Sequence, residues 1–445
     1  MKLKKYLLVG ILSTSLFISN ALAEPPSKPS GSAPGSNSSN SNISYSGSTT
    51  ITTNTNESDK TYTSTSGGEN AILVSNGTST LNIDGGTITT NGSHANGVFA
   101  YSNGTININN ASINTTGNNS GGIMVTGGGV LNATNLTVKT TGNSSAAIRS
   151  DRGGGTLNVT GGEYETNGIG SPAIYSTADI IVNNAKLVST SSEGVVVEGK
   201  NTVTLDNVEL IDTNNTLNGN SETYKNIFLY QSMSGDADTG TSIFSAKDST
   251  ITTNKGDTIF VTNTTATINL ENNKIVNNDG DFLRIQTGKW GSSGSNGGDV
   301  TLNLINQKIN GNINVDSIST LDINLSNGSI FEGTINNNDE AKEISLTLSS
   351  DSVIILTNDS YIDSLTNEVS DNSNIYLNGY KLYVNGSSVD GNNEDYTSTT
   401  GNDDVTTTNN LNSKNNNNYT LYIIGGVVLV IVIGTIIVIV KKKKD

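Results

Sequence analysis

The residues best suited to acid–base chemistry lie close together between positions 149 and 165. Arg149, Asp151 and Arg152 belong to the run RSDR, and Glu163 and Glu165 follow it. A basic residue beside carboxylates suits a calcium-assisted lyase of acidic polysaccharides, and paired carboxylates can hydrolyse a glycosidic bond. In the simpler interpretation, Arg149 lies on an outer face and Arg152 screens the charge of Asp151. We favour this interpretation and predict no catalytic residues.

Other reactive side chains are scarce. Arg284 is the only other arginine of the chain. An enzyme would need acidic residues to converge with Arg149 or Arg284 in a groove. The single histidine, His94, lies in the turn NGSHANG, which is typical of a solvated loop residue. The absence of cysteine excludes thiol catalysis and cysteine-based zinc sites. We therefore expect no metal and no cofactor.

The chain is organised by a repeat of three short apolar runs separated by Asn, Gly and Ser. The first inward residues of successive repeats are spaced by 26, 25, 25, 26 and 21 residues. They are Ile72, Val98, Ile123, Ile148, Ile174 and Val195. The second runs give Leu81, Ile106, Leu131, Leu157, Ile181 and Val203, and the third runs give Ile88, Ile113, Val138, Tyr164, Leu187 and Leu210. Beyond Asp212 the repeats restart at Ile227, Ile259, Phe282 and Ile313.

Three short strands and three bends per repeat predict an all-β fold, a parallel β-helix in which each strand pairs with its equivalent one coil on. The crossover rule for parallel strands predicts right-handed winding. Asparagines at a recurring position are expected to form ladders between coils. Insertions at about 214–226, 232–240 and 287–298 should emerge from bends, where solenoids often carry binding loops.

An outward column supplies the candidate ligand site. If the first and third residues of each first strand face inward, the residue between them faces outward. This column contains Phe99, Met124, Arg149 and Tyr175, with Phe228 and Phe260 beyond the insertion. A solvent-facing ladder of large side chains could stack sugar rings or dock a protein. The alternative is ordinary cross-coil packing on a β face or cover from an inserted loop. Trp290, in the loop GKWGSSGSNGGD, is a further candidate contact, or an anchor of its own loop.

The two ends of the chain predict export and membrane attachment. Residues 1–23 have three lysines, a short apolar run and Ala21-Leu22-Ala23, as a cleaved signal peptide does. Leu421 to Val440 is uncharged and long enough for one transmembrane helix, and the Lys-rich tail 441–445 should stay cytoplasmic. The expected location is the cell membrane, single-pass, with the bulk of the chain extracellular at the cell surface.

The segments between these ends complete the predicted organisation. Residues 24–46 read as a disordered Pro/Ser/Gly linker, 47–343 as the β-helix, 344–386 as its C-terminal cap, and 387–420 as a disordered, acidic Asn/Thr-rich stalk. The formal charge is −16; without the three leader lysines it is −19, and without the KKKKD tail it is −22. Such an acidic exterior argues against nucleic acid as a partner.

Coils of the type GTLNVTGGEYETNG and the closing block LTNDSYIDSLTNE, SNIYLNGYKLYVNG carry a family likeness. They resemble bacterial adhesin-like, right-handed parallel β-helix surface proteins, similar in the helix to pertactin-like passenger domains of autotransporters. The resemblance covers roughly residues 60 to 386 and implies surface display and adhesion. The single C-terminal helix departs from autotransporters.

Together these features predict a membrane-anchored adhesin-like protein that binds an extracellular glycan or protein through the side of a β-helix. One alternative is a cell-surface polysaccharide lyase or hydrolase on the same scaffold. Another is a purely structural surface-layer or stalk protein.

Overall fold

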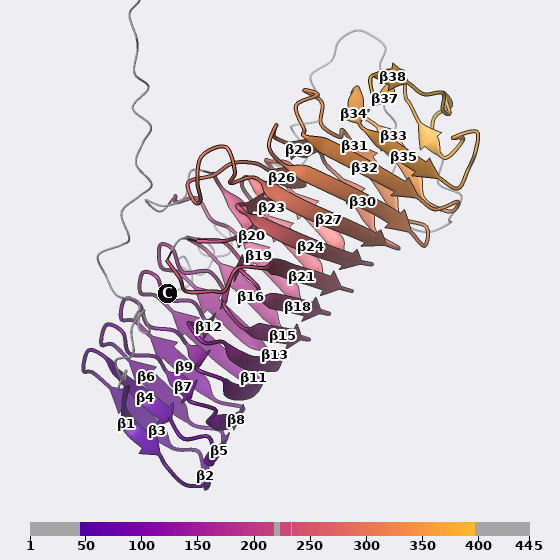
Figure 1. The fold of residues 1–445 in the computed structure, drawn as a ribbon. Coiled ribbons are helices and arrows are strands. Elements are labelled where there is room, and N and C mark those ends of the chain that lie inside the picture. The colour runs from indigo at the N-terminus through magenta and orange to yellow at the C-terminus, as the bar shows by residue number, and fades with distance from the viewer. Residues whose placement is uncertain (1–44, 218–222, 233, 397–445) are drawn as a thin grey trace, which may run out of the picture. The chain divides into compact units, whose positions relative to one another are not determined.

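The computed structural model describes residues 45–217, 223–232 and 234–396. They form an all-β parallel solenoid of about 13 turns with about 25 residues per turn, which confirms the predicted β-helix. Figure 1 shows the coils stacked one on another from β1 to the last strands. Among these residues no helix could span a membrane. The predicted signal peptide, most of the linker, the transmembrane helix and the tail lie outside the described residues.

The first strands of successive coils pair in parallel into an 11-stranded sheet, here called the first row. Its strands are β1 (Ser46–Ile51), β4 (Glu69–Val74), β7 (Val98–Tyr101), β10 (Ile123–Thr126), β12 (Ile148–Ser150), β14 (Ile174–Ser176), β17 (Val195–Glu198), β20 (Lys225–Tyr230), β23 (Asp257–Thr262), β26 (Leu283–Ile285) and β29 (Ile313–Val315). The helix begins at Ser46, one residue before its predicted start.

The second row holds the middle strand of each coil. It contains β2 (Thr55–Ser58), β5 (Thr80–Asp84), β8 (Thr105–Asn109), β11 (Gly129–Thr140), β13 (Gly155–Thr166), β15 (Asp179–Asn183), β18 (Thr202–Asp206), β21 (Thr241–Lys247), β24 (Thr264–Glu271), β27 (Gly298–Ile305), β30 (Thr320–Ser326), β32 (Glu343–Leu348) and β35 (Ser364–Asn367).

The third row holds the last strand of each coil, and β11 and β13 run through both rows. Its other strands are β3 (Thr61–Ser64), β6 (Thr87–Thr90), β9 (Ser112–Thr115), β16 (Lys186–Ser189), β19 (Glu209–Asp212), β22 (Thr250–Thr253), β25 (Lys274–Asn277), β28 (Lys308–Asn310), β31 (Ile330–Gly333), β33 (Val353–Leu356) and β36 (Ile375–Tyr376).

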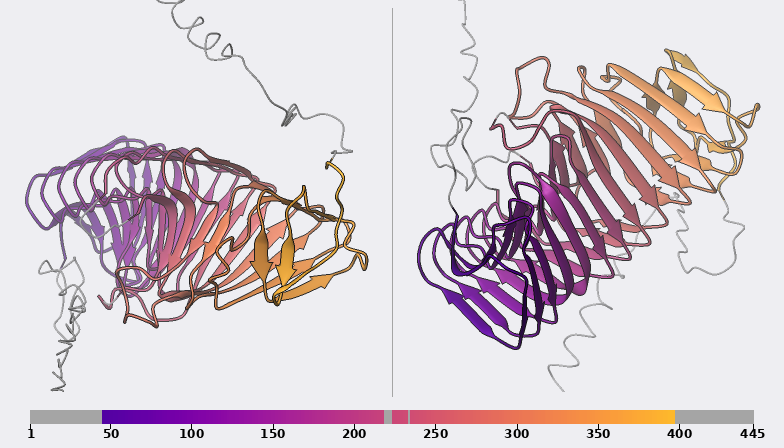
Figure 2. Two further views of the ribbon diagram at one scale, coloured as in Figure 1. Left: turned by 90° about the horizontal axis from the view of Figure 1, so that it is seen from above. Right: turned by 60° about the horizontal axis from the view of Figure 1, so that its bottom comes forward.

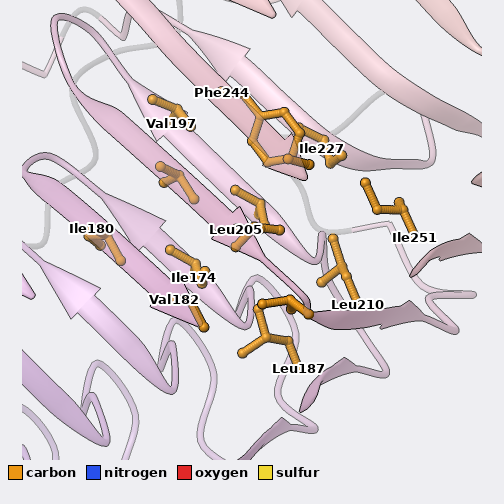
Figure 3. Close-up of a cluster of buried hydrophobic side chains, with 14 of the residues drawn as sticks. Ile174, Ile180, Val182, Leu187, Val197, Leu205, Leu210, Ile227, Phe244 and Ile251 are labelled. Carbon is orange, nitrogen blue, oxygen red and sulfur yellow. The ribbon is translucent and has the colours of Figure 1, made fainter. Parts of the chain in front are cut away.

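The inward side chains of the three rows form one continuous hydrophobic core along the stack. In Figure 3, Ile174, Leu187 and Leu205, which belong to three different rows, lie in the same buried cluster. The pairing registers reproduce the predicted first and third columns. Burial of apolar side chains is the dominant favourable contribution to folding. The chain has no disulfide to add to it.

One predicted core position and one predicted coil start are off by one residue, although Phe282 itself is buried in the core. In the second row Leu157 pairs with Ile180, whereas the predicted Ile181 points outward and is 39% exposed. In the first row Ile259 pairs with Leu283 rather than with Phe282. Each site has two adjacent apolar residues, so apolar alternation alone could not set the register.

The predicted asparagine ladder is present on the outer side of the second row. Nδ2 of Asn82 donates to Oδ1 of Asn56 at 2.7 Å. The same bond continues at 2.7, 2.8 and 2.8 Å through Asn107, Asn132 and Asn158. Each side-chain amide is therefore hydrogen-bonded to the equivalent asparagine of the neighbouring coil.

The bends have their own columns. Between the second and third rows, Asn110, Asn135 and Asn184 adopt positive φ, which asparagine tolerates better than most residues. Between the third and first rows, successive coils place glycine where the backbones touch. A Cβ on Gly142 would lie 1.9 Å from the carbonyl oxygen of Gly117. No side chain fits there without moving the coil.

All three predicted insertions are present, and they leave bends on either side of the first row. One joins β19 to β20, the second follows β20, and the third separates β26 from β27. Figure 2 shows such loops extending from the stack near its middle.

The coils continue through the residues predicted as a cap. Sheet pairing runs from β30 through β32 to β35, and from β31 through β33 to β36. The end is closed by β34 (Ser360–Ile362), β37 (Leu382–Val384) and β38 (Ser387–Ser388), of which the last two are antiparallel. Residues 387–396, predicted as the start of the stalk, instead fold onto the last coil, where Leu377 N donates to Asn392 O at 2.8 Å. The rest of the predicted stalk lies outside the described residues.

The glycine column gives the first prediction. Replacing Gly142 by alanine should lower the free energy of unfolding by roughly 2 kcal/mol or more, because the bend must shift to relieve the contact. Urea unfolding followed by circular dichroism measures this. Gly67→Ala is the matched control, since its Cβ would meet nothing closer than 3.6 Å. Equal midpoints for the two variants would contradict the packing argument.

Candidate functional site

The predicted outward column of the first row is confirmed as a column. Register pairs join Phe99 to Met124, Met124 to Arg149 and Arg149 to Tyr175. Beyond the insertion they join Phe228 to Phe260, and Phe260 to Arg284. These side chains lie outside the main core.

The prediction that this column faces solvent is wrong for most of its members. Phe99 and Met124 are fully buried, and Arg149, Phe228 and Phe260 are 7%, 9% and 5% exposed. They point away from the core, but aromatic neighbours and inserted loops cover them. The alternative considered from the sequence, cover by a loop, holds for the central coils.

The N-terminal part of the column is a small separate cluster. Leu73, Phe99 and Met124 pack with Tyr45 and Tyr101. The Tyr45 ring lies edge-on to Phe99 at 4.9 Å and to Tyr101 at 4.7 Å between centroids. Burial raises the pKa of the Tyr45 hydroxyl to about 12. Tyr45 precedes the first strand, so the start of the solenoid covers its own outer face.

The central part is a second cluster, formed where two insertions meet the first row. Val196, Phe228, Tyr230 and Phe260 are buried together. The rings of Phe228 and Tyr230 are stacked at 4.4 Å, and Lys225 Nζ lies 4.5 Å from the centroid of Phe228. At the rim of this cluster Tyr175 and Trp290 stay partly exposed.

Trp290 is held in place by its own loop. Its ring packs on Tyr230 at 5.8 Å between centroids. Asn296 Nδ2 donates to the carbonyl oxygens of Gly288 and Trp290 at 2.9 Å each. Both interpretations of this residue therefore hold in part, since it anchors the loop and still presents ring surface.

Glu198 is the buried acid at the centre of this cluster, and the sequence analysis missed it. The hydroxyls of Tyr175, Tyr230 and Ser232 all donate to its carboxylate. Burial is the main cause that raises the pKa of Glu198, and these hydrogen bonds oppose it. The residue lies two positions beyond Val196 and therefore on the same outer face, a signal that strand alternation could have supplied. The network ties three successive coils, through β14, β17 and β20, to Ser232 in the loop that follows β20.

Arg149 does converge with an acidic residue, but in a closed ion pair. Its Nη2 lies 3.2 Å from Oδ2 of Asp151, and both side chains are almost fully buried. Burial raises the pKa of Asp151, and the charge of Arg149 opposes the shift. Arg152 turns to the inserted loop and pairs with Asp236. Asp151 is therefore paired by Arg149 itself and not chiefly by Arg152.

The other acidic candidates are also paired. Arg284 Nε lies 2.8 Å from Asp257, and its Nη2 pairs with Asp281. Glu163 and Glu165 lie in the third row, where they pair with Lys186 at 3.3 Å and with Lys139 at 3.0 Å. The carboxylates that a lyase or hydrolase would use thus contact cations in these pairs.

Two further observations concern possible ligands. The structure has a shallow hollow of about 310 Å³ at the bend between the second and third rows, beside Lys186, Glu209 and Asp248. Within the described ranges no group of three or more His, Cys, Asp or Glu could hold a metal ion. His94 lies in its bend with a positive φ of 60° and intermediate exposure, as expected for a loop residue.

The closing sheet of β34, β37 and β38 carries an aromatic pair that the sequence analysis did not select. Tyr361 and Tyr383 are in register, and their rings are stacked at 4.8 Å with an interplanar angle of 5°. Both are partly exposed. Extending the first-strand alternation into the runs SYI and LYV would have identified them.

Asp212 is a buried acid at a position that most coils give to Ser or Thr. It pairs in register with Ser189 on one side and Thr253 on the other, and it has no exposed surface. Burial is the main cause that raises the pKa of Asp212 to about 8; Glu193 adds to the shift and Lys225 opposes it. Its Oδ1 atom accepts a hydrogen bond from Asn214 N at 2.7 Å, whereas its Oδ2 atom has no hydrogen-bond partner among the described residues.

Comparison of the chain with protein-family models, curated proteins and solved structures finds no match.

Asp212 predicts an unusual pH dependence. Because its pKa is raised from 3.8 to about 8 on folding, its contribution to stability is full below about pH 4 and is lost as the pH rises toward 8. The free energy of unfolding should fall by up to about 1.4 kcal/mol per pH unit over this window. Asp212→Asn should flatten the profile, since Asn277 occupies the equivalent position two coils on. Urea titrations between pH 4 and 8 check this, and parallel profiles for the two proteins would contradict it.

Proposed function

We propose that the chain is an exported, single-pass membrane protein whose β-helix is held outside the cell and acts in adhesion. The leader at 1–23, the apolar segment Leu421 to Val440 and the lysine block after it support this location. About 13 coils at roughly 4.8 Å each give a scaffold about 60 Å long. The proposal includes the right-handed winding expected of parallel strands and the likeness to adhesin-like surface proteins.

The partly exposed ring of Trp290 is the observation that carries the proposal. Tryptophan is the side chain most often found at interaction hot spots, and this one is the only tryptophan of the chain. It stands on an inserted loop at the rim of an aromatic cluster, with Tyr175 at the same rim. A rigid, half-buried ring can stack a sugar or a protein side chain at little entropic cost. The ligand surface that we propose is this rim.

An acidic-polysaccharide lyase or hydrolase fits the geometry less well. Such an enzyme needs an open groove with free carboxylates beside a cation. Asp151, Asp257 and Asp281 are instead in contact with arginines, and Glu198 accepts three hydroxyl hydrogen bonds. A purely structural surface rod is the remaining alternative, and the experiment below separates it from adhesion.

Replacing Trp290 by alanine should reduce adhesion of cells that display the full-length chain, by about 10-fold if the ring is a hot spot worth roughly 1.4 kcal/mol or more. The measurement counts cells retained on host-cell or matrix-coated surfaces under flow. Surface display must be equal, as an antibody to the helix would show.

Tyr380→Ala is the matched control, because this tyrosine is 39% exposed but lies at the far end of the solenoid, away from the cluster. It should leave adhesion unchanged. If wild-type display confers no retention, or if Trp290→Ala and Tyr380→Ala behave alike, the proposed binding surface is wrong.

A further inference from the structure

Among the described residues, no insertion leaves a bend that borders the outer face of the second row from β2 to β13. Each insertion leaves a bend beside the first row, whereas the bends between the second and third rows are short in these coils. Gly85 and Gly86 alone separate β5 from β6, and Asn110 and Ala111 alone separate β8 from β9. The asparagine ladder from Asn56 to Asn158 runs along the middle of this face.

The ladder presents identical, pre-ordered hydrogen-bonding groups to solvent. Each side-chain amide has two N–H groups and two acceptor lone pairs. The bonds along the ladder use one N–H of each donor and one acceptor position of the next residue. One N–H and one lone pair per interior amide are left, and they repeat at about 4.8 Å along the helix axis. Because the amides are fixed by the ladder, a ligand would not have to order them.

The strip is bordered by short and mostly uncharged side chains. On one side lie Thr80, Thr105, Val130 and Thr156, and on the other lie Asp84, Asn109, Thr134 and Thr160. Only Asp84 of these is charged, in a chain whose net charge is −16. Cationic and anionic polymers are therefore poorly matched to this strip. It also lacks the large apolar anchors that protein partners use.

We propose that this strip binds an extended, uncharged polysaccharide chain lying along the helix axis, with about one sugar unit per coil. Vicinal sugar hydroxyls both donate and accept, as the free positions of the amides and threonines do. A β-linked chain in its extended form advances by about as much per sugar as the solenoid does per coil, about 5 Å. This inference shares the extracellular location of the proposed function but uses a different face, so the two can fail separately.

The strip sets a length for its ligand. The asparagine column is interrupted in the next coil, where the partner of Asn158 is Ile181. Five coils span about 19 Å between the first and last amide at roughly 4.8 Å per step. Four or five sugar units fill that distance. Short oligosaccharides should therefore bind much more weakly than those of five or six units, because each coil adds a similar increment.

The test is calorimetric titration of the purified full-length chain, in detergent, with cellobiose, cellohexaose and oligogalacturonate. We expect cellohexaose to bind at least 10-fold more tightly than cellobiose, and the anionic oligogalacturonate not to bind. Asn107→Asp with Asn132→Asp places charge in the column and should weaken cellohexaose binding 10-fold or more. Thr105→Glu with Thr156→Glu places charge beside the ladder but leaves its asparagines in place, and should also weaken cellohexaose binding 10-fold or more. A loss in this variant could not be explained by a broken ladder.

The matched control is Asn269→Asp with Asn303→Asp. These residues belong to a second ladder that runs from Ser245 to Asn324 with bonds of 3.1, 2.8 and 2.9 Å. Glu271 and Asp322 border that ladder, so it lacks the uncharged margin. The control should leave cellohexaose binding unchanged.

Several outcomes would overturn the inference. These are no binding of cellohexaose, equal binding of cellobiose, or an equal loss in the control variant. Loss of cellohexaose binding in Trp290→Ala would move the ligand to the first row, which would sustain the proposed function and reject this one. Sedimentation showing that the wild type self-associates, and that Asn107→Asp with Asn132→Asp is monomeric, would assign the strip to a second copy of the chain.

Discussion

Parallel pairing at a one-coil repeat places every residue directly beside its own equivalent, and the rest of the structure depends on this constraint. Residues that occupy the same position in successive coils must be able to pack against one another at a spacing of about 4.8 Å. Apolar residues satisfy it in the core, asparagines satisfy it through the amide ladder, and Gly117 and Gly142 satisfy it by having no side chain where backbones touch. Charged columns alternate in sign, as Lys247 and Glu271 do. In such a pair an acidic residue lies beside a basic one in the neighbouring coil and not beside a like charge.

The same constraint divides the outer surface into faces with different roles. The first row places large apolar side chains such as Phe99 and Phe228 outside the core, and each is then covered by aromatic neighbours or an insertion. Along β2 to β13 the second row places short polar side chains outside, and those coils need no cover. Two surfaces are therefore candidates for binding. One is the rim formed by Tyr175 and Trp290 beside the insertions, and the other is the polar strip along the asparagine ladder. The functional proposals follow this division.

Most of the fold could be predicted from the sequence because spacing alone specifies which residues stack. The limits appear where spacing is ambiguous. Ile180 and Ile181 both fit an apolar column, and only three-dimensional pairing decides that Ile180 faces inward. The site was less predictable, because alternation gives the direction of a side chain and not its exposure. The outward direction of Phe260 was predicted correctly, but its burial depends on loops whose path no local pattern encodes. Alternation could have placed Glu198 on the outer face but not shown its burial, and Asp212 was missed because a lone acid in a strand gives no sign of what surrounds it.

The central claim is that this solenoid is a displayed binding scaffold and not only a structural rod or an enzyme. Probing an array of glycans and matrix proteins with the labelled full-length chain tests it most directly, with oligosaccharide products assayed in the same wells. The account predicts saturable retention on a restricted set of spots, with no shortening of the bound glycans. Uniform absence of retention across the array would contradict binding, and release of shortened glycans would contradict the non-enzymatic interpretation.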